Sequence, residues 1–97
     1  MKKVFDIKVE INNVYHLKFI HRFTHKEEYK YFTYRVDTRN DPDCSTYKSG
    51  CIVSVENNKL CAELFDKNLW LLYPTYVLYI NDEKVLVGKT KKLYEGN

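Results

Sequence analysis

The chain has few of the residues that break or staple protein structure. Its 97 residues include two prolines and three glycines, so neither a linker nor a low-complexity tract is expected. The three cysteines, Cys44, Cys51 and Cys61, form no CxxC pair, and an odd count without an export signal indicates reduced thiols. No run approaches the ~20 apolar residues that cross a bilayer, and no secretory apolar segment follows the N-terminal lysines. We therefore expect a cytoplasmic protein.

Strong helix formers are also scarce. The sequence has one alanine and no glutamine, whereas nine tyrosines and five phenylalanines, together with Val, Ile and Thr, favour strands. Hydrophobic residues make up 44% and charged residues 30%, which is typical of a globular protein. The length fits one domain, so we expect residues 1–97 to fold as a single β domain.

Alternation of apolar and polar residues predicts a first hairpin. Residues 4–11 and 14–22 each alternate with a period of two, and Asn12-Asn13 between them supplies turn chemistry. A two-residue loop would place the apolar side chains of the two strands on opposite faces. We therefore expect a longer loop or a bulge, because a one-residue slip moves every side chain to the other face.

Two more hairpins are predicted. Residues 51–56 and 59–65 flank Asn57-Asn58, and a two-residue turn there gives one wholly apolar face made of Cys51, Val53, Val55, Leu60, Ala62 and Leu64. The opposite face carries Ser54, Glu56, Lys59, Cys61 and Glu63, and we expect it to be largely wet. Residues 76–80 pair with 84–89, with Ile80 opposite Val85 and Leu78 opposite Val87. This pairing leaves both faces apolar, as in a central or barrel-closing pair.

The remaining segments complete the predicted fold. Residues 29–37 are predicted as a further strand and residues 38–50 as one long loop. Asp66 is a suitable N-cap and Pro74 a stop signal, which predicts one short helical turn near 67–73. We expect an all-β fold, a small antiparallel barrel or sandwich of six to seven short strands, SH3-like or OB-like.

No arrangement of residues indicates catalysis or metal binding. His16 and His21 have opposite strand parity, and neither they nor His25 form a metal-ligand spacing with the cysteines. Cys44 has no activating group nearby in the sequence. Asp37, Asp41 and Asp43 lack EF-hand spacing, and there is no glycine-rich phosphate loop. We therefore predict no catalytic residue, no metal and no cofactor.

Aromatic residues alternate with cations between Lys26 and Arg35. Strand parity places Tyr29, Tyr31 and Arg35 on one face, next to Arg39 and Tyr47 of the expected loop. We predict a partner-binding surface there. Burial of tyrosine rings in a strand is the structural alternative. Trp70 and Tyr73, in the apolar run 69–73, form a second predicted surface because such residues dominate protein interfaces.

Composition and surface together favour binding over chemistry. The many lysines and asparagines are typical of AT-rich coding sequence, which is common in low-GC bacteria, their phages and some large viruses or parasites. The hypothesis is a small non-enzymatic protein that inhibits or modulates another macromolecule, for example a phage-encoded, anti-CRISPR-like inhibitor of a host defence nuclease. The expected partner is a protein or its nucleoprotein complex, with no membrane contact, and a homo-oligomer is one form such a contact could take.

The alternative is a nucleic-acid-binding small β-barrel. Its contacts would come from Lys30, Arg35, Lys89, Lys91 and Lys92. The net charge is only +3 and the pI about 8.7, which is below the usual footprint of a dedicated nucleic-acid domain.

Overall fold

The chain folds into two antiparallel sheets with two short helices. The computed structural model describes residues 3–10, 12–36, 42–46 and 51–95. The elements in chain order are β1 (Lys3–Lys8), β2 (Val14–Ile20), β3 (Tyr29–Val36), β4 (Pro42–Thr46), β5 (Cys51–Glu56), β6 (Lys59–Leu64), α1 (Lys67–Leu72), β7 (Thr75–Ile80), β8 (Glu83–Lys89) and α2 (Thr90–Glu95). The predicted all-β class is confirmed.

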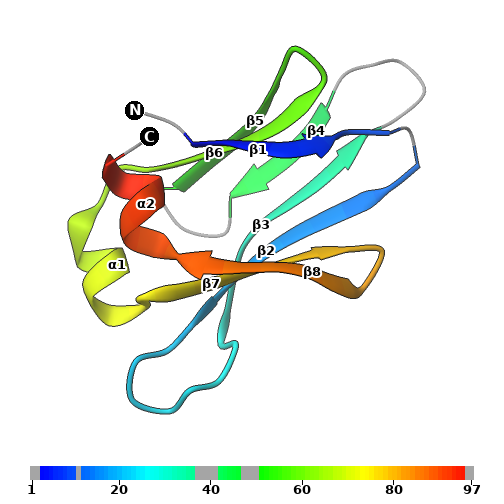
Figure 1. Ribbon diagram of the computed structural model, residues 1–97. Helices are drawn as coiled ribbons and strands as arrows, with labels where there is room; N and C mark the ends of the chain where they lie inside the picture. The colour runs from blue at the N-terminus through cyan, green and yellow to red at the C-terminus, as the bar shows by residue number, and fades with distance from the viewer. Residues whose placement is uncertain (1–2, 11, 37–41, 47–50, 96–97) are drawn as a thin grey trace.

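One sheet has the strand order β1-β6-β5 and the other the order β4-β3-β2-β7-β8 (Figure 1). Their apolar faces share one core, which includes Phe5, Val53 and Leu60 of the small sheet and Tyr15, Leu17, Phe19, Tyr76 and Leu78 of the large sheet. No pairing between the described strands closes the two sheets into a barrel. No helix in the described ranges is long and apolar enough to cross a membrane.

The first predicted hairpin is wrong. β1 pairs with β6, whereas β2 pairs with β3 and β7. The apolar side chains of the two segments face the core from different sheets, with Phe5 2% exposed and Leu17 fully buried. The conflict of parity that a short loop would create is therefore resolved by separating the two strands, not by lengthening their loop.

The middle hairpin is confirmed with its predicted register. Glu56 lies opposite Lys59 and Val53 opposite Ala62, and both turn asparagines have positive φ, 52° at Asn57 and 65° at Asn58. These angles are those of a type I′ turn, which matches the twist of the strands. The opposite face of this hairpin was predicted to be solvent-exposed, and this prediction is wrong at Cys61, which is fully buried. Cys61 is buried because β6 is the central strand of its sheet and α2 packs against it.

The last hairpin forms with a different register. Asn81-Asp82 make a two-residue turn, so Ile80 lies opposite Glu83 instead of Val85. The pairing register then shifts by one residue at Val85, so Leu78 lies opposite Leu86 instead of the predicted Val87. β8 is also an edge strand, since it is the last strand of the large sheet and not a central one.

Outside the hairpins, the structure contains a strand where the sequence predicted a loop. The predicted loop 38–50 contains β4, which pairs with β3 along Pro42–Thr46, because an extended segment can pair without apolar alternation of its own. The predicted helical turn is confirmed as α1, where the Asp66 carboxylate accepts a hydrogen bond from the Asn68 N–H at 2.9 Å. A second helix, α2, follows β8 directly and packs against α1.

Candidate functional site

The predicted binding strand is β3, which lies inside the large sheet between β4 and β2. Tyr29 lies opposite Phe19 and Arg35 opposite Val14, and the register shifts between these two pairs. The predicted common face assumed unbroken alternation along this strand, and the shift interrupts it. The side chains of Tyr29, Lys30, Tyr31 and Arg35 fall outside the described part of the protein, as do Arg39 and Tyr47 altogether.

The second predicted surface is placed differently from the expectation. Tyr73 caps the end of α1 and is only 2% exposed, so it belongs to the core. Trp70 is half-buried, with its ring centroid 6.3 Å from that of Tyr94 in α2 and the Lys91 Nζ 5.6 Å from the indole centroid. Its buried Nε1 has no hydrogen-bond acceptor within the described residues.

Apolar surface does occur in this region, but on other residues. Leu71 and Leu72 of α1 are 38% and 40% exposed, and Phe23, in the loop after β2, is 73% exposed. The Arg22 N–H donates to the Leu72 carbonyl at 2.9 Å, which holds the loop against the end of the helix. We call Phe23, Leu71 and Leu72 the Phe23 patch. A cluster of exposed large apolar side chains indicates an interaction site more strongly than scattered ones do.

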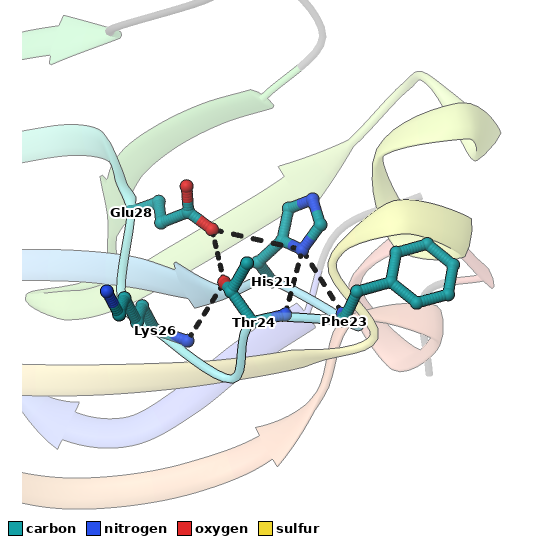
Figure 2. A network of polar contacts seen from close by, with 5 residues as sticks. All are labelled: His21, Phe23, Thr24, Lys26 and Glu28. Atoms are coloured by element: carbon teal, nitrogen blue, oxygen red, sulfur yellow. Dashed lines mark hydrogen bonds and ion pairs between the residues drawn. The ribbon is translucent and has the colours of Figure 1, made fainter.

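His21 organises the turn that carries Phe23 (Figure 2). Its Nδ1 accepts hydrogen bonds from the backbone N–H groups of Phe23, at 3.1 Å, and Thr24, at 3.3 Å. The ring also meets Tyr73 edge-on, with the centroids 5.1 Å apart. Nδ1 is therefore the unprotonated nitrogen in this arrangement, and the imidazole joins the exposed turn to the core.

Further hydrogen bonds join residues of the loop 21–28 to one another. The His21 N–H donates to the Lys26 carbonyl and the His25 N–H to the His21 carbonyl, each at 2.9 Å. His25 has a φ of 61°, in the left-handed region. The Thr24 hydroxyl donates to the Glu28 carboxylate and accepts from the Lys26 N–H at 3.4 Å (Figure 2). Phe23 thus projects from a turn fixed by several hydrogen bonds.

The loop is also tied to the large sheet. The Tyr79 hydroxyl of β7 donates to the Glu27 carboxylate, with 2.7 Å to each oxygen. This hydrogen bond raises the pKa of Tyr79 above its usual value, and partial burial and the negative charge of Glu27 add to the effect. Lys18 lies over the same ring, with its Nζ 4.5 Å from the centroid.

Three of the predicted basic residues lie at the junction of β8 and α2. Lys89, Lys91 and Lys92 are all exposed. In the described ranges, no group of three His, Cys, Asp or Glu side chains is placed to hold a metal ion.

The sequence prediction named Trp70 and Tyr73 in the apolar run 69–73 and did not name Phe23. The run 69–73 does contribute apolar surface, but through Leu71 and Leu72, because the helical turn directs Tyr73 inward. The available signal was a lone aromatic within the polar stretch 21–28. An aromatic in such a loop has no strand or helix face that would bury it.

No family model, curated protein or solved structure matches this chain.

Proposed function

We propose that this protein is a non-enzymatic binding module that modulates a protein partner through the Phe23 patch. The observation that supports the proposal is the 73% exposure of Phe23 on a hydrogen-bonded turn. A large aromatic held in water by a fixed turn loses little conformational freedom on binding, so its burial contributes fully to affinity. The partner would offer an apolar pocket wide enough for a phenyl ring, with Leu71 and Leu72 at its margin.

The test compares Phe23→Asp with Ile52→Asp. Ile52 is also exposed, at 50%, but lies on β5 in the small sheet. Proteins that co-purify with the wild type and with Ile52→Asp, but not with Phe23→Asp, are then purified and titrated by calorimetry. We expect Phe23→Asp to weaken binding at least ~30-fold, about 2 kcal/mol, as for an interface hot spot. Equal binding by both variants would contradict the proposal.

Composition suggests one class of partner. We carry forward the proposal of a phage-encoded, anti-CRISPR-like inhibitor of a host defence nuclease, and it rests on size and on an amino-acid composition typical of AT-rich coding sequence. Nuclease activity measured with and without the protein tests it. Inhibition that is lost in Phe23→Asp would connect this class of partner to the Phe23 patch.

A second candidate function is nucleic-acid binding by a small SH3-like or OB-like barrel. It is favoured by the three exposed lysines 89, 91 and 92 near the junction of β8 and α2. Fluorescence anisotropy with labelled single- and double-stranded oligonucleotides at ~50 and ~200 mM salt distinguishes the two candidates. Phosphate contacts release counterions, so nucleic-acid binding should weaken ten-fold or more over this range. No binding at low salt would remove this candidate.

A further inference from the structure

Strand β8 is an open edge of the large sheet (Figure 1). It pairs with β7 along one side, and no other described strand pairs with its outer side. The backbone N–H and C=O groups on the outer side of such an edge are the groups that pair with an added strand.

The side chains of β8 are those of an interior strand. Leu86 packs against the core, whereas Val85 and Val87 are 46% and 55% exposed. Apolar residues on both faces are typical of a strand that is covered on both sides. An edge strand of this composition therefore indicates that another strand or surface covers it.

The sequence of β8 is complementary to itself. Residues 83–89 are centred on Leu86. Antiparallel pairing of two copies with Leu86 opposite Leu86 places each Val85 opposite a Val87. This apolar cross-strand pair is favourable, and it occurs twice because the pairing has two-fold symmetry.

We propose that β8 binds β8 of a second copy in this register, which joins two large sheets into one continuous sheet. The register shift at Val85 marks a bulge in β8, and a bulge increases strand twist and shortens the regular ladder. The contact is therefore weak, as expected for a small interface.

Sedimentation velocity over a concentration series tests the association. The wild type should pass from the 11.7 kDa monomer to twice that mass, and Val87→Lys should raise the dimer dissociation constant at least ~10-fold by placing a charge opposite Val85. Ile52→Lys, the matched control at an exposed apolar position on β5, should dimerise as the wild type does. A monomer at every concentration, or equal dimers in Val87→Lys, would overturn the proposal.

Discussion

Gly88 lies opposite Tyr76 in the β7–β8 pair, and the Tyr76 phenol ring covers it. A Cβ atom at position 88 would overlap the ring of Tyr76. Tyr76 is itself 3% exposed and part of the core, with its ring 5.9 Å from that of Phe5. The glycine is therefore required by close packing of an aromatic ring across the strand pair.

We predict that Gly88→Ala lowers the free energy of unfolding by about 1–3 kcal/mol, because Tyr76 must shift within a packed core. Urea denaturation measures the change. Lys92→Ala, at an exposed position of α2, is the control and should change stability by less than ~0.5 kcal/mol. A Gly88→Ala variant as stable as the wild type would contradict the prediction, because it would show that the Tyr76 ring can move aside without loss of stability.

A second prediction at this scale concerns Tyr79. Glu27→Gln should lower the pKa of Tyr79 toward its usual 10.0, because the amide accepts a weaker hydrogen bond from the phenol and carries no charge. The raised pKa favours the neutral phenol in the folded state. Its contribution to stability is therefore complete below pH 10 and is lost as the pH rises through the raised value. The ¹³Cζ chemical shift of Tyr79 followed by NMR against pH measures both variants, and identical titrations would contradict the assigned cause.

At the scale of elements, the residues of a turn determine its local backbone conformation but not which strands pair with each other. Asn12, Asn57 and Asn81 all have positive φ, between 51° and 75°. Only the second and third begin two-residue hairpins. The turn at Asn12 instead leads the chain from the small sheet to the large one. An asparagine pair therefore predicts a left-handed turn more securely than it predicts which strand pairs with which.

The hairpin of β5 and β6 allows a direct test of its turn. Asn58→Gly should raise the free energy of unfolding by up to ~1 kcal/mol, because Asn-Gly is the preferred type I′ pair and φ at this position is 65°. Asn58→Ala should act in the opposite direction, since a Cβ without a polar side chain disfavours this region. Thermal denaturation of the three proteins gives the order, and a stabilising Asn58→Ala would contradict it.

At the scale of the molecule, Phe5 connects the two sheets. It extends from β1 of the small sheet and meets Tyr76 of the large sheet edge-on at 5.9 Å, with an interplanar angle of 67°. The core combines buried residues from both sheets with Leu93 of α2. Neither sheet can keep its apolar face covered without the other, so they should unfold together.

We predict that Phe5→Ala destabilises the whole fold by about 3–5 kcal/mol, through lost burial and the cavity left behind. Unfolding should remain a single transition when followed by Trp70 fluorescence and by circular dichroism. Two separate transitions would show that each sheet is stable by itself.

The predictions made from the sequence succeeded where the signal was local. The Asn57-Asn58 hairpin, the helical turn behind Asp66 and the strand predicted at 29–37, which is observed as β3, follow from turn residues, an N-cap and alternation. The sequence also placed apolar surface near residues 69–73. It did not place Phe23, because exposure of a loop residue depends on which elements pack beside the loop.

What the sequence determined by itself is the β class, the positions of two hairpins and the apolar faces of β1, β2, β5 and β6, since these depend on neighbours within a few residues. Only the tertiary structure decided that β1 joins β6, that Cys61 is buried and that the loop carrying Phe23 is hydrogen-bonded to the end of α1. Each of these depends on contact between segments far apart in the chain. Several strands with equal alternation compete for the same partners, and the choice among them is made by shared burial in one core.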